Sequence, residues 1–133
     1  MNLNHVTLPA VDVRRSAAFY RALGLLQIVD ASHYARFEFP DGEATLSVHL
    51  SDALDRPGVV VYFECAQLDD RVRQLQSHGF VFTALPSNQP WLWREARLKD
   101  PSGNVICLFA AGDNRRNPPY SARKRHAIET ARV

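Results

Sequence analysis

The sequence predicts an α+β fold made of two βαβββ modules, and two observations predict it. The segment from His5 to Leu25 aligns with the segment from Val60 to Phe80, 55 residues further along the chain. In both copies an apolar stretch typical of a strand precedes apolar residues at helical spacing, and three more strand-like segments follow. Because a twofold repeat of this length has too few copies for a solenoid, we expect the modules to pack as a single domain, residues 1–112.

Module one is predicted over about residues 3–50. It opens with a strand at His5–Pro9, and its helix at Val13–Leu23 carries one apolar stripe, with arginines on the other face. Gly24 follows this helix, at the position where a left-handed residue ends a helix at little cost. Three further strands are predicted, with the turn signal Pro40-Asp41-Gly42 before the last of them: Leu25–Val29, Tyr34–Phe39 and Thr45–Leu50.

Module two is predicted over about residues 58–110. Its first strand is expected at Val60–Glu64 and its helix at Leu68–His78, with Gly79 ending the helix as in the first copy. The extra residues of this copy fall at Pro86–Pro90, which we interpret as a loop. Three further strands are predicted, with the turn signal Pro101-Ser102-Gly103 before the last of them: Phe80–Leu85, Trp93–Leu98 and Val105–Phe109.

Composition excludes several function classes for this chain of 133 residues. A formal net charge of +2 does not favour a nucleic-acid binder, and two cysteines are too few for a disulfide-framed secreted scaffold. No apolar run approaches the roughly 20 residues of a membrane span and no signal peptide is evident, so we expect a cytoplasmic protein without membrane or nucleic-acid partners. The charge is unevenly spread: residues 113–133 hold six Lys and Arg against two Asp and Glu, which predicts a basic C-terminal arm over the domain or a partner chain.

Three motifs together suggest a family. Asn4-His5-Val6-Thr7-Leu8 opens the chain, Arg15-Ser16-Ala17-Ala18-Phe19-Tyr20 is followed by Leu23-Gly24-Leu25, and Asp100-Pro101-Ser102-Gly103-Asn104 precedes the last strand. Through them residues 3 to about 110 resemble the vicinal oxygen chelate superfamily, which includes glyoxalase I, fosfomycin and bleomycin resistance proteins, and extradiol dioxygenases. The resemblance implies an open half-barrel mixed sheet with flanking helices that cups a divalent metal, and it implies a homodimer.

The metal ligands of that family are matched only in part. The resemblance implies a histidine ligand from the first strand of each module, and His5 stands at that position in module one. Its counterpart in the repeat is Val60, which cannot ligate a metal. The last strand of module two has Cys107 where the family usually has a glutamate, and a thiolate is a softer ligand.

Two other side chains are candidate substitutes for the missing ligands. Strand alternation places His49 and Glu64 on the concave side of their strands, so His5, His49 and Glu64 are the predicted ligands of Fe, Mn, Ni or Zn. Other interpretations stay open: His49 facing solvent, Glu64 as a buried carboxylate paired with Arg97, and Cys107 as part of the core.

A tryptophan-rich segment precedes the last strand pair, and it predicts a ligand pocket. Trp91 and Trp93 are candidate walls of this pocket, and Tyr62 shares the concave side of its own strand. Arg97 would favour an anionic ligand, because its planar guanidinium binds oxyanions through two parallel hydrogen bonds. The alternative is an edge strand anchored by aromatic side chains.

Two functions stay open on this evidence. The first is a glyoxalase-like or dioxygenase-like enzyme, a metal-dependent lyase, isomerase or dioxygenase, in which Glu64 or Glu95 acts as the base on a small oxygen-bearing substrate. The second is a metal-free protein that binds or sequesters a small molecule, as bleomycin resistance proteins do. The chain has no glycine-rich phosphate loop, nucleophile elbow or Cys-x-x-Cys motif, so other common chemistries have no support.

Overall fold

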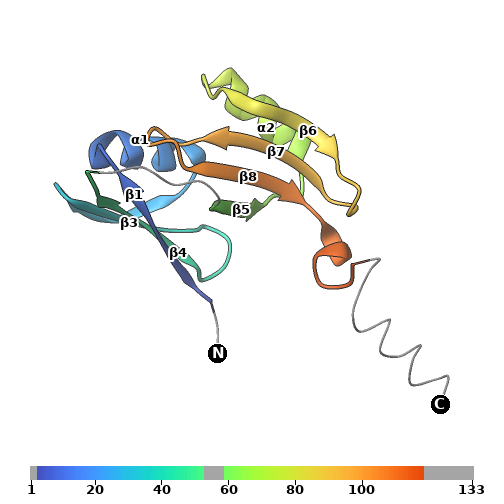
Figure 1. Cartoon of the computed structure of the whole chain (residues 1–133), viewed down its shortest axis with the longest axis horizontal. Coiled ribbons are helices and arrows are strands. Elements are labelled where there is room, and N and C mark those ends of the chain that lie inside the picture. Colours follow the sequence, from blue (N-terminus) through green and yellow to red (C-terminus); the bar gives the residue numbers. More distant parts are fainter. Residues whose placement is uncertain (1–2, 53–58, 119–133) are drawn as a thin grey trace, which may run out of the picture. The chain divides into compact units, whose positions relative to one another are not determined.

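The computed structural model describes residues 3–52 and 59–118, and Figure 1 shows them in chain order. The chain divides into two compact units, Met1–Val61 with Leu98–Ile106 and Tyr62–Arg97 with Cys107–Val133. The predicted α+β fold with two βαβββ modules is confirmed, since each module combines one helix with a four-stranded sheet. The predicted basic arm lies almost wholly outside the described residues. No helix in the part that the structure describes is long and apolar enough to cross a membrane.

Module one has the predicted order of elements. Strand β1 is His5–Ala10 and helix α1 is Val13–Leu23. The side chain of Asp12 caps α1 by accepting a hydrogen bond from the N–H of Arg15, 3.1 Å away. Gly24 ends the helix with a φ of 116°, which confirms the predicted left-handed cap. The remaining strands are β2, β3 and β4, at Leu26–Ala31, Tyr34–Glu38 and Thr45–Leu50.

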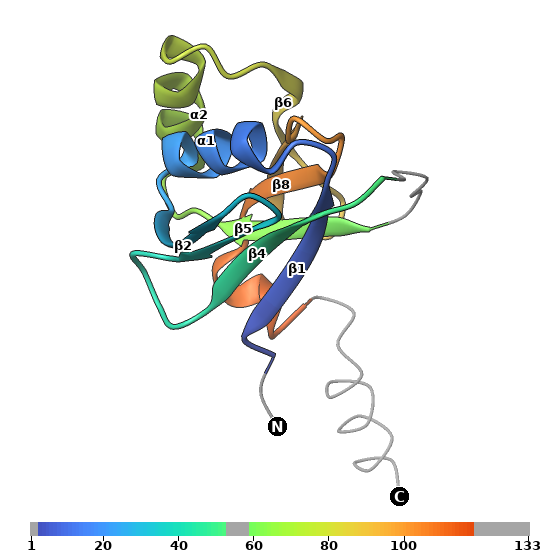
Figure 2. The ribbon, with the colours of Figure 1, turned by 90° about the vertical axis from the view of Figure 1, so that its left-hand side faces the viewer.

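The first sheet has the order β1-β4-β3-β2, with β1 parallel to β4 and the other neighbours antiparallel. Helix α1 lies across one face of this sheet (Figure 2). The side chains on that face and on the facing side of α1 are buried and mostly apolar: Leu8, Ala10, Val13, Ala17, Tyr20, Ala35, Phe37, Leu46 and Val48. Because strand side chains alternate, every second residue of β1, β3 and β4 points to the opposite face.

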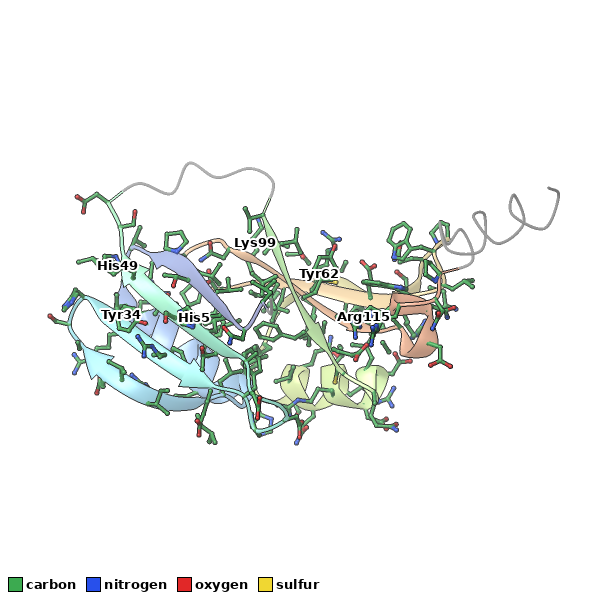
Figure 3. The ribbon with its side chains drawn as sticks, turned by 90° about the horizontal axis from the view of Figure 1, so that it is seen from below. His5, Tyr34, His49, Tyr62, Lys99 and Arg115 are labelled. Carbon is green, nitrogen blue, oxygen red and sulfur yellow. The ribbon has the colours of Figure 1, made fainter. Side chains whose placement is uncertain are left out.

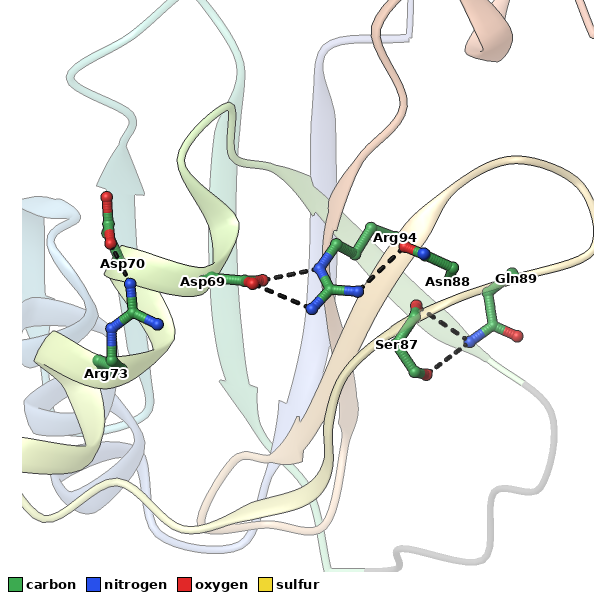
Figure 4. Close-up of polar contacts among 7 residues, drawn as sticks. All are labelled: Asp69, Asp70, Arg73, Ser87, Asn88, Gln89 and Arg94. Carbon is green, nitrogen blue, oxygen red and sulfur yellow. Dashed lines mark hydrogen bonds and ion pairs between the residues drawn. The ribbon is translucent and has the colours of Figure 1, made fainter.

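Module two repeats this arrangement with a second sheet of order β5-β8-β7-β6. Its helix α2, Leu68–Ser77, buries three apolar residues on one stripe. Arg94 ties the start of β7 to this helix: its Nε and Nη2 donate to Asp69 at 2.8 and 2.9 Å, and its Nη1 donates to Asn88 at 3.0 Å (Figure 4). The strands are β5, β6, β7 and β8, at Val60–Glu64, Phe82–Asn88, Arg94–Lys99 and Val105–Ala110.

Strand β6 differs from the prediction at its end. The segment Pro86–Pro90 was expected to be a loop, but β6 continues to Asn88 and includes Pro86. The strand order places β6 at an edge of the second sheet. A proline is tolerated on an edge strand because its missing N–H removes no hydrogen bond from the sheet interior.

Strand β7 begins one residue later than predicted, at Arg94. The preceding segment is a tight turn, in which the N–H of Gln89 donates to the carbonyl of Trp93 at 2.7 Å. Leu92 takes a φ of 66° within this turn. Both tryptophans, Trp91 and Trp93, lie in this turn between β6 and β7.

The turn before β8 is held by the carboxylate of Asp100, which is only 4% exposed. Tyr20 donates its hydroxyl to this carboxylate at 2.8 Å, and the backbone N–H groups of Ser102 and Asn104 donate at 3.0 and 2.8 Å. The side-chain amide of Asn104 donates both to Asp100 and to the carbonyl of Pro9, at 2.8 and 2.9 Å. Asp100 therefore joins α1, the turn and the end of β1 within one compact unit.

We predict that Tyr20→Phe lowers the free energy of unfolding by about 1.5–3 kcal/mol, because it removes a hydrogen bond from a buried carboxylate. Burial and the neighbouring Asp100 raise the pKa of Tyr20 far above its ordinary value, so the phenol stays a donor. Urea denaturation measures the change. Tyr62→Phe is the matched control, since its exposed hydroxyl makes one contact of 3.5 Å and its loss should change stability by less than about 0.5 kcal/mol. Equal losses in the two variants would contradict the role of Asp100.

Candidate functional site

The face of the first sheet opposite α1 carries a row of polar side chains. The register pairs His5 with Thr45 on β1 and β4, and it pairs Arg36 with Ser47 on β3 and β4. Tyr34 lies on the same strand and the same side as Arg36. Figure 3 shows His5 and Tyr34 on this sheet. The sequence predicted His5 on this face but not its partners, because their proximity depends on the register between strands.

These side chains form a continuous chain of hydrogen bonds. The Nε of Arg36 donates to the Tyr34 hydroxyl at 2.8 Å, and that hydroxyl bonds to Ser47. The Oγ of Ser47 lies 3.0 Å from Nε2 of His5, whose Nδ1 lies 2.5 Å from the Oγ1 of Thr45. In either neutral tautomer, both ring nitrogens of His5 are therefore engaged by hydroxyl groups.

The environment of Tyr34 favours negative charge on its oxygen. Partial burial acts to raise its pKa, but hydrogen bonds with Ser47 and Arg36 and the positive charge of Arg36 together lower the pKa below its ordinary value. The Arg36 guanidinium also lies over the Tyr34 ring, 5.4 Å from its centroid. Arg36 is thus held by the phenol on which it packs.

His49 lies away from His5 on the same sheet. The register pairs His49 with Pro9, four residues along β1 from His5, which corresponds to about 13 Å at the rise of a strand. The Nδ1 of His49 donates to the carbonyl of Leu50 at 3.1 Å, and its ring meets His33 edge-on at 6.1 Å. The structure therefore does not bring together the two predicted histidine ligands.

Glu64 is exposed on β5. Its carboxylate lies 3.9 Å from Nε of Arg115, in a short 3-10 helix at Gly112–Arg115 that the sequence did not predict. The interpretation of Glu64 as a buried carboxylate paired with Arg97 is wrong, because Glu64 is half exposed and Arg97 contacts Glu95. The apolar run around Glu64 suggested burial, but β5 lies at an edge of the second sheet.

Aromatic rings gather on the second sheet. Trp93 stacks on Phe109 with centroids 4.6 Å apart and planes 18° apart. Tyr62 meets both rings edge-on, at 6.0 Å from Trp93 and 5.8 Å from Phe109. We call these three rings the aromatic face. Sequence reasoning missed Phe109, although its shared parity with Cys107 on β8 places the two on the same side.

A buried carboxylate lies beside the aromatic face. Glu95 is 4% exposed, and its Oε2 accepts a hydrogen bond from Nε1 of Trp91 at 2.7 Å. Its Oε1 lies 3.5 Å from Nη2 of Arg97 and 3.6 Å from Sγ of Cys107. Arg97 also donates to the Tyr62 hydroxyl at 3.5 Å. The structure thus gathers all the predicted substrate-binding residues and the predicted base Glu95, though not Glu64.

The chemistry of these donors does not suit a divalent metal. In the described part of the chain, no group of three or more His, Cys, Asp or Glu side chains lies close enough to hold a metal ion. On the first sheet His5 is surrounded by hydroxyls, and on the second sheet Arg97 already neutralises Glu95. Burial, followed by the charge of Glu95, raises the pKa of Cys107 to about 12, so its thiol stays protonated rather than ligating. The predicted Fe, Mn, Ni or Zn set does not fit either group of residues.

These modules define a class of protein: a repeated βαβββ unit in which a helix packs on one face of each four-stranded sheet. Residues 2–108 match the Glyoxalase/Bleomycin resistance protein/Dioxygenase superfamily, and the chain belongs to this superfamily. No curated protein matches the sequence.

Solved structures share this fold at low sequence identity. The bleomycin resistance determinant encoded on the transposon Tn5 is 24% identical, with 83% of this chain and 98% of that chain covered and a TM-score of 0.70. A bleomycin-binding protein complexed with bleomycin is also 24% identical, with the same shares covered and a TM-score of 0.69. Lactoylglutathione lyase from Agrobacterium tumefaciens is 17% identical, with 82% and 92% covered and a TM-score of 0.68. Identities this low show a common fold and no more.

We predict that Cys107 resists thiol reagents in the folded protein. A pKa of about 12 leaves on the order of one thiolate in ten thousand thiols at pH 8, and the side chain is fully buried. In a Cys65→Ser background, reaction with a disulfide reagent at pH 8 should be at least about 1,000-fold slower than after unfolding in guanidinium.

The reciprocal variant Cys107→Ser controls this experiment by leaving the half-buried Cys65, which should react faster. Reaction of Cys107 at the rate of the unfolded chain would show an accessible thiolate. That result would restore Cys107 as a candidate ligand.

Proposed function

We propose that this chain is a small-molecule-binding member of the superfamily whose ligand stacks on the aromatic face of the second sheet, without a metal held by this chain. The observation that carries the proposal is the convergence of three aromatic rings with the buried Glu95 and the half-exposed Arg97. Large rings with a few fixed polar groups are typical of small-molecule sites.

The accessible parts of this cluster suit a planar ligand. Tyr62 is 45% exposed and Trp91 is 44% exposed, although both are large aromatic side chains. Rings that keep one side free offer stacking area at a low cost in side-chain entropy. Arg97 and the Tyr62 hydroxyl supply polar groups for an oxygen-bearing molecule.

The charge of the cluster refines the predicted ligand. Arg97 was predicted to favour an anion, but Glu95 lies 3.5 Å from its guanidinium and compensates its charge. A neutral planar molecule with hydrogen-bonding oxygens therefore suits this face better than a free anion. The bleomycin-binding relative supports a binding role, since its own ligand is a small molecule. The homodimer implied by the family resemblance stays a prediction.

The metal-dependent enzyme has less support from the geometry. It needs His5, His49 and Glu64 around one ion, whereas His5 and His49 lie about 13 Å apart along their sheet. Glu95 would be the base of such an enzyme, but its carboxylate is already bound by Trp91 and Arg97. Neither arrangement offers a free ligand set for a Lewis acid.

We predict that the neutral planar probe N-phenyl-1-naphthylamine binds saturably and with the same affinity in EDTA as in added Zn²⁺ or Mn²⁺. Probe fluorescence is the readout, so variants that lack a tryptophan remain measurable. Trp93→Leu should weaken binding at least about tenfold, because it removes the stacked ring. Tyr62→Leu, at a more exposed position, should act in the same direction.

Val81→Ala is the control, since this apolar side chain in the same unit is 82% exposed and lies off the aromatic face. Its affinity should stay within about twofold of the parent, well under the roughly 1.4 kcal/mol of a tenfold change. Binding that requires added metal would overturn the proposal, and so would equal loss in the Val81 and Trp93 variants.

A further inference from the structure

Arg36 on the first sheet has a charge that no neighbouring carboxylate compensates. Among the described residues, no ion pair includes Arg36, whereas Arg94, Arg97 and Arg115 each pair with an acid. Glu38 shares the strand and the side of Arg36, but none of the ion pairs among the described residues joins the two side chains. The hydrogen bond from Nε to Tyr34 orients the guanidinium and leaves both Nη groups as donors.

The hydrogen-bond chain behind Arg36 has two self-consistent directions. A guanidinium only donates, so the Tyr34 oxygen always accepts from Arg36. In the first direction Tyr34 donates to Ser47, Ser47 donates to Nε2 of His5, and the Nδ1–H of His5 donates to Thr45. The hydroxyl of Thr7, 3.2 Å from the same Nε2, is a second donor to this nitrogen. Thr45 then donates to the carbonyl of Asn4 at 3.5 Å, so each of these hydrogens has an acceptor within the protein.

In the second direction every donor in the chain is reversed. His5 carries its hydrogen on Nε2 and donates to Ser47, with Thr7 Oγ1 as a second acceptor, while Ser47 donates to Tyr34 and Thr45 donates to Nδ1 of His5. The hydroxyl hydrogen of Tyr34 then has no acceptor among the described residues. The first direction keeps each hydrogen bonded within the protein, so it is the resting one until an acceptor stronger than water, such as a carboxylate, reaches the half-buried Tyr34.

We propose that Arg36 and Tyr34 form a second binding site, specific for the carboxylate of a small molecule, and that its occupation reverses the hydrogen-bond chain and switches the tautomer of His5. The carboxylate accepts from the Nη groups of Arg36 and from the Tyr34 hydroxyl. Charge-assisted bonds to a planar oxyanion are the strongest that these donors can make. The protein neither gains nor loses a proton: the hydroxyls rotate, and His5 gives its Nδ1 hydrogen to solvent and takes one from solvent on Nε2.

The Arg36 site suits an anionic ligand, unlike the aromatic face, which suits a neutral one. Arg97 is compensated by Glu95, while Arg36 donates to the uncharged hydroxyl of Tyr34, behind which Ser47 and His5 continue the chain. An anion is therefore better stabilised at Arg36 than at Arg97. This proposal does not depend on the proposed function, because the two sites lie on different sheets. A carboxylate without an aromatic ring cannot stack on the aromatic face of the second sheet.

Propionate and its neutral isostere propionamide are the probes, titrated into the full-length protein at pH 8, where an ordinary imidazole is neutral. Histidine ring ¹⁵N spectra report both binding and the tautomer of His5. We expect saturable binding of propionate and at least tenfold weaker binding of propionamide. On saturation with propionate, the hydrogen of His5 should move from Nδ1 to Nε2.

Variants separate the contributions of the two residues. Arg36→Gln should weaken propionate binding at least tenfold, and Tyr34→Phe should weaken it and abolish the tautomer change, since no hydroxyl then links the ligand to Ser47. Arg15→Gln removes the same charge from the exposed side of α1 and should leave binding within twofold. Equal binding of propionamide, an unchanged affinity in Arg36→Gln, or a His5 tautomer that stays fixed at saturation would each overturn the proposal.

Discussion

The alternation of side chains along each strand is the constraint on which this structure depends. A helix packs on one face of each sheet, so apolar residues such as Phe37, Leu46 and Val48 must occupy that face. The residues between them are thereby committed to the other face. In the first sheet those residues include hydroxyls, histidines and Arg36. In the second they include the three rings of the aromatic face and Glu95. The packing of the core on one face of each sheet therefore determines which side chains form the two candidate sites.

The polar groups around His5 and around Glu95 satisfy one another. The hydroxyls of Thr45 and Ser47 take both nitrogens of His5, and Arg97 takes the charge of Glu95. Such arrangements need no cation, and breaking the one around Glu95 would leave a buried carboxylate unpaired. The family match gives the fold, whereas function depends on side chains such as these, so the fold does not by itself define a function.

Periodicity was enough to predict most of the fold. The helix at Val13–Leu23 and the strands at Thr45–Leu50 and Val60–Glu64 were predicted with the bounds that the structure has. The end of β6 was missed, because the sequence does not show that Pro86 lies on an edge strand. The role of Asp100 was also missed, since its partner Tyr20 lies 80 residues away in sequence.

The candidate site was predictable where side chains share one strand. Glu95 and Arg97 are two residues apart, so strand alternation predicts that they share a side of β7, and they do. Contacts across strands, such as Tyr34 with Ser47 or Trp93 with Phe109, depend on register, and a one-residue shift would exchange the faces. His5 and His49 share a face, as side-chain alternation predicts. Their separation along the sheet depends on the register between β1 and β4, which the sequence does not show.

The central claim is that the groups around His5 and Glu95 bond to one another and leave no ligand set free for a divalent metal, and equilibrium dialysis of the metal-stripped protein tests it most directly. Dialysis against micromolar Zn²⁺, Ni²⁺, Mn²⁺ or Fe²⁺, followed by elemental analysis, measures the ions bound per chain. The account predicts no stoichiometric uptake that depends on His5, so the parent and His5→Ala should retain the same small amount. Uptake of one ion per chain that His5→Ala abolishes would contradict it.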